Sequence, residues 1–432
     1  MPYPKLPNLH EKINRLYDYV SLRHEYGAKG LETPLLDLEK AVDDTLEKIL
    51  AAPVDEILRA KEPDCLEAIK KLRPDGPRRI WKKFDADVYA DRLAGAFLGR
   101  MAGCTLGAIV ELWDVSEMEK YAAHYGLAFP PKNYWTHTPW PYHLRYGKSA
   151  CSDYTLGGIK GVPVDDDITY TLLGLLIAED CGLGFTREDA ANAWVKYLPY
   201  ACTGEDIALK NLKSGVSVKD SADIGNPFCQ WIGADIRCDP FGYLAPGLPE
   251  KAAAMAYNES YVSHRRNGIY GSMFFAAAIA AAFATGDAIE AVRIGMTEIP
   301  AECSLYKDIE WALSVCPTVR DYKDGRAAVD ERFAGMHPVH TNNNACLTIF
   351  GVSIGGGDTG RAISETVAMG MDNDCTGATA GSLAGAAAGM AGLSPHWYKD
   401  FDNTVFSYLN HNDEFTIDDV LRRFAALAEK NF

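Results

Sequence analysis

Apolar and polar residues recur with helical spacing along most of this 432-residue chain, and convincing strand alternation is nearly absent. Residues 8–72 combine this spacing with charged faces, for example over residues 35–51. A Pro-Asp-Gly-Pro turn at residues 74–77 then interrupts the pattern. We therefore predict an all-α protein with a helical N-terminal extension at residues 1–76 and one large domain at residues 77–432. We interpret the extension as a packing or oligomerisation element.

Polar residues with helix-capping chemistry mark several expected helix starts. These are Thr186, Thr416, Asp287 ahead of a helix over residues 288–295, and Asp358 or Thr359 ahead of one over residues 361–370. The longest apolar run covers residues 273–284. It is too short to span a bilayer and predicts a buried helix.

Two acidic clusters carry the most distinctive chemistry in the sequence. Asp372 and Asp374 stand directly ahead of a run made almost entirely of Gly, Ala, Ser and Thr. Three aspartates at residues 165–167 stand at the head of an apolar segment, and neither cluster has an obvious basic partner in the sequence. Carboxylates this close repel each other unless a cation or a proton lies between them, and hard cations prefer oxygen ligands.

A simpler alternative exists for each cluster taken alone. Acidic residues in the first turn of a helix are favoured by the helix dipole and need no metal. Two such turns, each leading into a helix that is expected to be buried, favour a metal site over this alternative.

Three further blocks accompany the clusters, which lie about two hundred residues apart. These blocks are residues 92–111, which end at Glu111, residues 232–237 and residues 263–271. In this order the motifs resemble the ADP-ribosylglycohydrolase family, over residues of about 88–395. The resemblance implies that the all-α fold is an orthogonal multi-helix bundle, with the catalytic domain at residues 77–432.

The resemblance also implies a metal-dependent hydrolase that cleaves a glycosidic bond at ribosyl C1, with two Mg²⁺ or Mn²⁺ ions as cofactors. The implied metal ligands are Asp165, Asp166, Asp167, Asp372, Asp374 and Cys375. The implied catalytic residues are Glu111, Asp166 and Asp374. The implied substrate contacts are Gly233, Asp235, Arg237, His264, Asn267 and Gly268. Taken without the resemblance, Arg237 suits a structural ion pair equally well, and Asn267 with Gly268 suits a simple turn.

The chain departs from the family pattern at three positions of the expected site. Cys104 stands where the family usually has Asp, Asp165 where it usually has Thr, and Cys375 where it usually has Thr or Ser. A thiol is a poor ligand for a hard ion, whereas an additional carboxylate is a good one. We therefore expect a retained metal site and an altered substrate preference.

The expected partner is an ADP-ribosylated protein or a small ribosylated molecule from which ADP-ribose is released. One alternative is a hydrolase of a small ribosylated metabolite or nucleoside-like N-glycoside. Another is a non-catalytic member of the family that binds ADP-ribose or has a structural role. Retention of both aspartate clusters favours the enzyme, because a structural role has no need of five metal-binding carboxylates.

Composition limits the classes of binding partner and the cellular compartments that we expect for the protein. A formal net charge of −16 weighs against nucleic acid as a partner. Eleven cysteines without a C-x-x-C pair favour free thiols in a reducing compartment. With neither a secretory signal nor a membrane span evident in the sequence, we expect a cytoplasmic protein without a membrane partner. The sequence leaves the oligomeric state open.

Overall fold

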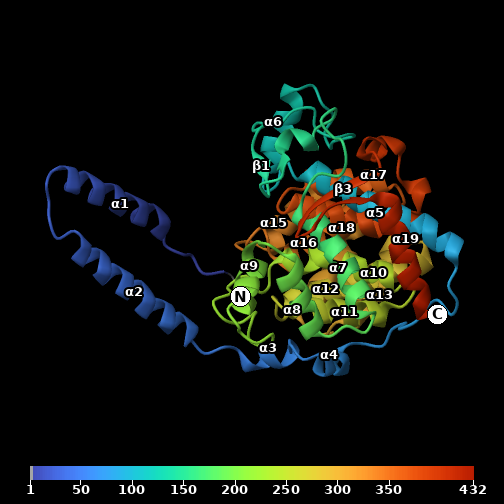
Figure 1. Cartoon of the computed structure of the whole chain (residues 1–432), viewed down its shortest axis with the longest axis horizontal. Helices are drawn as coiled ribbons and strands as arrows, with labels where there is room; N and C mark the ends of the chain where they lie inside the picture. The colour runs from blue at the N-terminus through green and yellow to red at the C-terminus, as the bar shows by residue number, and fades with distance from the viewer. Residues whose placement is uncertain (1–2) are drawn as a thin grey trace. The chain divides into compact units, whose positions relative to one another are not determined.

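The computed structural model describes residues 3–432, and the chain divides into two compact units, one reaching Ala60 and the other spanning Lys61–Phe432. The first unit contains the long helices α1 (Leu9–Glu25) and α2 (Glu32–Leu50), in which no residue is buried (Figure 1). Helix α3 (Glu56–Lys61) ends at the division. The predicted domain boundary at residue 76 stays a prediction.

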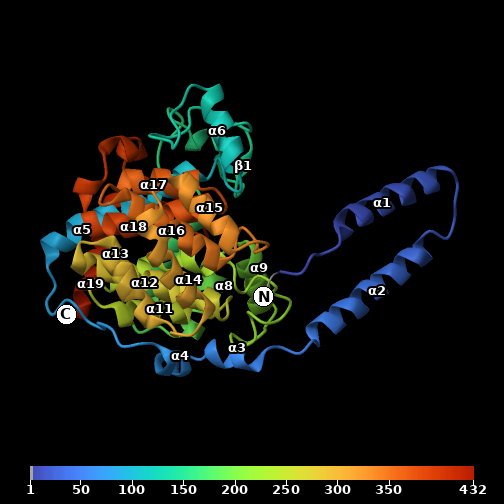
Figure 2. The ribbon, with the colours of Figure 1, turned by 180° about the vertical axis from the view of Figure 1, so that it is seen from behind.

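Helices form most of the second unit, and the two opposite views in Figures 1 and 2 show most of them packed into one bundle, with α6 (Val115–His124) set apart from it. In chain order they are α4 (Leu66–Leu72), α5 (Ala86–Gly107), α6 (Val115–His124), α7 (Asp166–Cys181), α8 (Arg187–Tyr197), α9 (Thr203–Lys213), α10 (Asp239–Leu244), α11 (Pro249–Ser260), α12 (Asn267–Thr285), α13 (Ala288–Gly295), α14 (Ser304–Val315), α15 (Tyr322–Arg332), α16 (Thr341–Gly355), α17 (Thr359–Ala368), α18 (Asn373–Ala388) and α19 (Ile417–Ala428). The all-α fold predicted from the sequence is confirmed.

Two short antiparallel hairpins interrupt the helices, and the sequence analysis predicted neither. They are β1 (Leu144–Arg145) with β2 (Ser149–Ala150), and β3 (Thr404–Leu409) with β4 (Asn412–Thr416). Strands of two residues are too short to show any alternation. In β3 the buried residues do not alternate strictly, so its sequence lacks the period-two pattern of a strand with one exposed face.

Most of the predicted helix starts are confirmed. The Asp287 carboxylate accepts hydrogen bonds from two backbone N–H groups in the first turn of α13, whose bounds match the prediction. Thr186 and Thr416 cap α8 and α19 in the same way. Asp358 caps α17, which begins and ends two residues earlier than predicted. The helix cannot reach residue 370 because Gly370 adopts a φ of +73°, in the left-handed region.

The predicted buried helix over residues 273–284 forms most of α12. By length and composition alone, α12 is the one helix of the described residues that could cross a membrane. However, 89% of its apolar stretch is buried inside the protein, where it packs against α10, α11, α13 and α18. A helix that is apolar on all sides and surrounded by other helices is a core helix.

Glycines allow α5 and α18 to pack with their backbones in contact. Glycines spaced four residues apart on α5 face a similar row on α18, which runs in the opposite direction; Gly95, Gly99 and Gly103 lie against Gly385, Gly381 and Gly377, respectively. A Cβ atom at Gly103 would lie 2.0 Å from the Gly377 carbonyl oxygen, so no other residue fits there without displacement. At Gly107 it would lie 2.4 Å from the Asp374 Cα atom. This packing therefore fixes the C-terminal end of α5 against the first turn of α18.

Candidate functional site

The two aspartate clusters stand at the N-termini of two buried helices. Asp165 is the N-cap residue of α7, and its carboxylate accepts a hydrogen bond from the Asp167 backbone N–H. Asp372 is the N-cap residue of α18, and Asp374 lies in the first turn of that helix. The helix dipoles favour negative charge at both places. All four of these aspartates are buried, whereas Asp166 is partly exposed.

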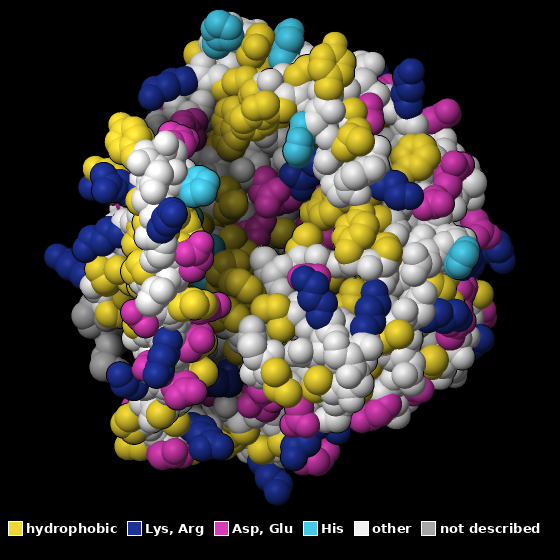
Figure 3. All heavy atoms as spheres, turned by 60° about the vertical axis from the view of Figure 1, so that its left-hand side comes forward, with side chains coloured by type: hydrophobic (Ala, Val, Ile, Leu, Met, Phe, Trp, Pro, Cys, Tyr) yellow, Lys and Arg dark blue, Asp and Glu magenta, His cyan; other side chains and the backbone are white. Residues whose placement is uncertain are grey.

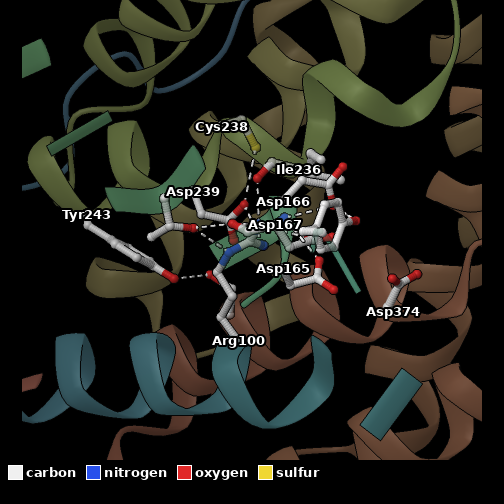
Figure 4. A network of polar contacts seen from close by, with 12 residues as sticks. Arg100, Asp165, Asp166, Asp167, Ile236, Cys238, Asp239, Tyr243 and Asp374 are labelled. Atoms are coloured by element: carbon white, nitrogen blue, oxygen red, sulfur yellow. Dashed lines mark hydrogen bonds and ion pairs between the residues drawn. The ribbon is translucent and has the colours of Figure 1, made fainter. Parts of the chain in front are cut away.

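The fold brings the two clusters together with Glu111, which lies in the turn after α5. Three groups of side chains each place one ligand atom per residue within 4.8 Å of the others: Glu111–Asp372–Asp374, Asp167–Asp374–Cys375 and Cys104–Asp165–Asp167. Because the groups share Asp167 and Asp374, they form one continuous site. We call the five carboxylates of these groups, together with the adjacent Asp166, the acidic site; its members are Glu111, Asp165, Asp166, Asp167, Asp372 and Asp374. Figure 4 shows the aspartates of α7 on one side of it and Asp374 on the other.

A buried arginine lies inside the acidic site. Arg145 belongs to β1, and its Nη1 donates to Glu111 Oε2 at 2.8 Å and to the Ala108 carbonyl oxygen at 2.9 Å. Its Nη2 donates to Asp165 Oδ2 at 2.9 Å and to Asp374 Oδ2 at 3.1 Å. The expectation that neither cluster has a basic partner is therefore wrong. The pairing depends on the position of the β1–β2 hairpin, which the sequence analysis did not predict.

A second arginine contacts Asp167 from the interior of the fold. Arg100 of α5 is fully buried; its Nη2 donates to Asp167 Oδ1 at 2.9 Å, and its Nη1 pairs with Asp239 Oδ2 at 3.0 Å. Nη2 also donates to the Ile236 carbonyl oxygen, which belongs to the short 3₁₀ helix η2 (Ile232–Arg237). Figure 4 shows this network joining α5, α7 and η2. Asp167 is thus held in place by an ion pair on one of its oxygens only.

Several carboxylate oxygens of the acidic site have no hydrogen-bond partner among the described residues 3–432. They are Asp167 Oδ2, Asp372 Oδ1 and Asp374 Oδ1, all of which are buried. A buried charged oxygen without a hydrogen bond or counter-ion is costly. Hard divalent cations such as Mg²⁺ and Mn²⁺ take carboxylate oxygens as ligands. The donor set therefore fits such cations.

The pKa values of the aspartates reflect the same excess of negative charge. Burial raises the pKa of Asp372 to about 6, and the charge of Glu111 contributes next. Burial also raises the pKa of Asp374 well above its usual value, with further increases from Glu111 and Asp372. Arg145 lowers the pKa of Asp374, but less than these effects raise it. An additional positive charge in the site would favour the ionised carboxylates.

The two cysteines next to the acidic site, Cys104 and Cys375, are poor ligands for a hard ion. Burial raises the pKa of the Cys375 and Cys104 thiols well above the usual value, and neighbouring aspartates raise both further. Only the thiolate is an effective metal ligand, and it prefers softer ions than Mg²⁺. The metal-ligand role of Cys375 stays a prediction, although its sulfur lies within 4.8 Å of ligand oxygens of Asp167 and Asp374.

The predicted substrate-binding residues lie around η2 and the start of α12. In η2, Arg237 donates from Nη1 to Glu205 Oε1 at 2.5 Å and from Nε to Glu259 Oε2 at 3.0 Å. Its guanidinium group also lies over the Trp194 ring, 4.7 Å from the centroid. A Cβ atom at Gly233 would lie 2.0 Å from the same Glu205 carboxylate. Arg237 is thus held in buried ion pairs, and its contact with substrate stays a prediction.

The other members of this group are also buried. Both carboxylate oxygens of Asp235 lack a partner, and burial raises its pKa well above the usual value. His264 is buried and its pKa is lowered well below the usual value, mainly by that burial. Asn267 and Gly268 begin α12, where Asn267 Nδ2 donates to Glu62 Oε2 at 3.1 Å. None of these residues belongs to the acidic site, and their roles toward substrate stay predictions.

A cavity of about 430 Å³ opens beside Glu111 and Arg145. Its walls include Trp113, Trp140 and His143, and the two tryptophan rings meet edge to face with centroids 6.4 Å apart. Figure 3 shows a hollow in one face of the molecule, with acidic side chains inside and hydrophobic side chains around it. The Glu111 side chain is 35% exposed, so the acidic site is open to solvent at this residue. The sequence analysis missed these aromatic residues because they follow no periodic pattern.

The comparisons with known proteins agree with this geometry. The family model for ADP-ribosylglycohydrolase matches residues 85–430, and the chain therefore belongs to the ADP-ribosylglycohydrolase family. A solved structure described as an ADP-ribosylglycohydrolase-related protein complex superposes with a TM-score of 0.52 at 17% sequence identity. The alignment covers 80% of this chain and 100% of the other, and it supports the all-α fold. Among curated protein sequences, no significant match is found.

Proposed function

We propose that this protein is a Mg²⁺- or Mn²⁺-dependent hydrolase that cleaves a glycosidic bond at ribosyl C1. The proposed reaction releases ADP-ribose from a modified protein or from a small molecule. The family implies glycohydrolase activity on substrates of the ADP-ribose type. The observation that carries the proposal is the meeting of five carboxylates from three separate segments beside an open cavity.

The proposed site holds two divalent cations, with Asp165, Asp166, Asp167, Asp372 and Asp374 as ligands. The unpaired oxygens of the acidic site support this assignment. When bound, such cations supply Lewis-acid polarisation and orient ribose hydroxyl groups and water.

Glu111 is the proposed acid or base of the reaction. Four of the aspartates in the acidic site are buried, whereas the Glu111 side chain is 35% exposed and also lines the cavity. It is therefore the carboxylate best placed to exchange a proton with water or with a leaving group. The remaining carboxylates stabilise the positive charge that develops at ribosyl C1, because glycoside cleavage passes through an oxocarbenium-like state.

The cavity is the proposed binding place for one planar portion of the substrate. Trp113, Trp140 and His143 present aromatic surfaces next to Glu111. Aromatic faces of this kind stack well on nucleobases and on guanidinium groups. Substitution of the usual polar residues by Cys104 and Cys375 favours a second candidate, a hydrolase of a small ribosylated metabolite, because it changes the polarity beside the reacting carboxylates.

The test is a substrate screen with chromatographic detection of free ADP-ribose. ADP-ribosylated arginine peptides, ADP-ribosylated serine peptides and small ribosylated compounds are incubated with the protein and Mg²⁺ or Mn²⁺. We expect release from at least one class, and no release when a chelator is present. Binding of ADP-ribose without release from any substrate would contradict the proposal and support the non-catalytic alternative.

The protein is also proposed to act in a reducing compartment such as the cytoplasm. All eleven cysteines are free thiols in the structure, which is consistent with that environment.

A further inference from the structure

The position of Arg145 in the acidic site is not explained by the proposed reaction. Its two terminal nitrogens contact three carboxylates that come from three different segments, Glu111 after α5, Asp165 at α7 and Asp374 in α18. All three distances lie between 2.8 and 3.1 Å, and the Arg145 side chain is only 13% exposed. Charge-assisted contacts at these distances are strong. The guanidinium therefore holds together carboxylates that would otherwise repel one another.

These contacts engage one oxygen on each of three carboxylates of the acidic site, and a divalent cation would draw its ligands from the same carboxylates. Glu111 and Asp374 belong to one of the groups in which ligand atoms lie within 4.8 Å of one another, and Arg145 bonds to both of them. A cation coordinated by this pair would lie within a few ångströms of the guanidinium. Two positive charges at such a separation repel each other strongly when they are shielded from water. The guanidinium and a cation are thus mutually exclusive at this part of the site.

We propose that Arg145 is a built-in competitor of divalent cations, which occupies the acidic site in the cation-free protein and is displaced when cations bind. This inference rests on the proposed function, since it requires the acidic site to bind cations. As a consequence, half-saturation of the site with cations requires a higher cation concentration than it would if Arg145 were absent.

The surroundings of Arg145 allow the side chain to move while the hairpin stays in place. The backbone of the hairpin is anchored next to it, because the Tyr146 hydroxyl donates to Asp166 Oδ1 at 2.7 Å and the Tyr200 hydroxyl donates to the Tyr146 carbonyl oxygen at 2.5 Å. The Arg145 Nε is buried without a hydrogen-bond partner in the part of the chain that the structure describes. When Arg145 contacts the carboxylates, one of its hydrogen-bond donors is therefore left without an acceptor.

The cavity beside Glu111 offers the displaced side chain an alternative position. Arg145 itself lines this cavity, together with Trp113, Trp140 and His143. Rotation of the side chain toward the mouth of this cavity would release the three carboxylates.

The test is a titration of the full chain with Mn²⁺. Binding is measured by calorimetry and by electron paramagnetic resonance, which detects the free Mn²⁺. Wild type is compared with Arg145→Met, which removes the charge, and with Arg145→Lys, whose single ammonium group cannot contact all three carboxylates. Lys148→Met is the matched control. Lys148 lies in the same hairpin, but its ammonium group pairs with Asp413 at 2.8 Å on the exposed surface, away from the acidic site.

A competitor that occupies the site nine-tenths of the time weakens apparent cation binding about tenfold. We therefore expect Arg145→Met to bind Mn²⁺ about tenfold more tightly than wild type, Arg145→Lys to be intermediate, and Lys148→Met to match wild type. Arg145→Met should also have a lower melting temperature than wild type in chelator, and a similar one in saturating Mn²⁺.

Unchanged or weaker Mn²⁺ binding by Arg145→Met would overturn the inference. It would indicate that Arg145 instead holds the carboxylates in the positions that bind the cation. If Arg145→Met does not fold without cations, Arg145→Lys decides between the two outcomes by the same comparison. Absence of Mn²⁺ binding in every variant, wild type included, would overturn the proposed cation site itself and with it this inference.

Discussion

At the scale of single residues, the acidic site separates into buried and exposed carboxylates. Asp165, Asp167, Asp372 and Asp374 are buried and fixed by helix starts, whereas Glu111 remains accessible to solvent. The aspartates were apparent from the sequence, because acidic clusters ahead of apolar helices are distinctive, whereas Glu111 entered only through the family resemblance. The role of Arg145 was not, because it depends on contacts across long stretches of chain. Sequence spacing carries no information about such contacts.

Glu111→Gln should impair turnover without impairing the fold. The substitution preserves size and partial exposure but removes the ability to exchange a proton, which is typically worth about 10²- to 10⁴-fold in rate. We expect kcat to fall by that range while ADP-ribose binding and the melting temperature stay close to wild type. Equal single-turnover rates for the two proteins would refute the acid–base role of Glu111.

The raised aspartate pKa values predict how stability depends on pH in the absence of cations. Burial raises the pKa of Asp372 to about 6, from an ordinary value of 3.8 in the unfolded chain. The folded state therefore binds the proton more tightly, and the free energy of unfolding should fall as the pH rises from about 4 to about 6. Asp372 alone accounts for at most about 3 kcal/mol of this change.

Urea unfolding in the presence of chelator, measured between pH 4.5 and pH 7, tests this dependence. Asp372→Asn should flatten the slope, and saturating Mg²⁺ should remove most of the difference by favouring the ionised carboxylates. A free energy of unfolding that rises with pH over this range in the chelated protein would contradict the account.

At the scale of secondary structure, the site depends on the contact between α5 and α18. The sequence predicted the helical class from the spacing of apolar residues. It predicted several helix starts from capping residues such as Asp287 and Thr186, whose effect is local. The hairpins did not follow, because two-residue strands owe their existence to packing. The ends of helices were also less predictable, as α17 shows by ending ahead of Gly370.

Gly103→Ala tests the packing of these two helices. The new Cβ atom would lie 2.0 Å from the Gly377 carbonyl oxygen, so the helices must separate. We expect a loss of roughly 1–3 kcal/mol or more in the free energy of unfolding, together with weaker Mn²⁺ binding, because α18 carries Asp374. Gly184→Ala is the control, since a Cβ atom there meets nothing within 4 Å. Equal losses for both variants would show that the close contact is unimportant.

At the scale of the whole molecule, the segment between residues 61 and 76 belongs structurally to the second unit. Ile69 is fully buried, and the Glu62 Oε1 accepts a hydrogen bond from the Ser304 backbone N–H at 2.8 Å. Arg73 Nη1 donates to the buried Glu298 carboxylate at 2.5 Å. The sequence analysis predicts a domain boundary at the Pro-Asp-Gly-Pro turn after this segment, because composition shows where a turn lies, and that boundary stays a prediction.

Two truncations follow from these contacts. A chain beginning at Lys61 should keep the stability of the second unit, whereas one beginning at Pro77 should lose roughly 2–5 kcal/mol, because it removes the fully buried Ile69. It also leaves the buried Glu298 carboxylate paired with Arg78 and no longer with Arg73. Thermal and urea unfolding of the two truncated proteins provides the comparison. Equal stabilities would place the boundary of the catalytic domain at residue 76 after all.

The proposed function requires that cations held by the acidic site take part in the hydrolysis of a ribosyl C1 bond. The most direct test is single-turnover release of ADP-ribose from the best substrate of the screen, by wild type and by Asp374→Asn, with saturating Mg²⁺ or with chelator. Asp374→Asn keeps the size of the side chain and removes one cation-binding charge. We predict rapid release only by wild type with Mg²⁺, release at least about 100-fold slower by the folded Asp374→Asn variant, and no release in chelator. Full activity of Asp374→Asn, or of wild type in chelator, would contradict the account.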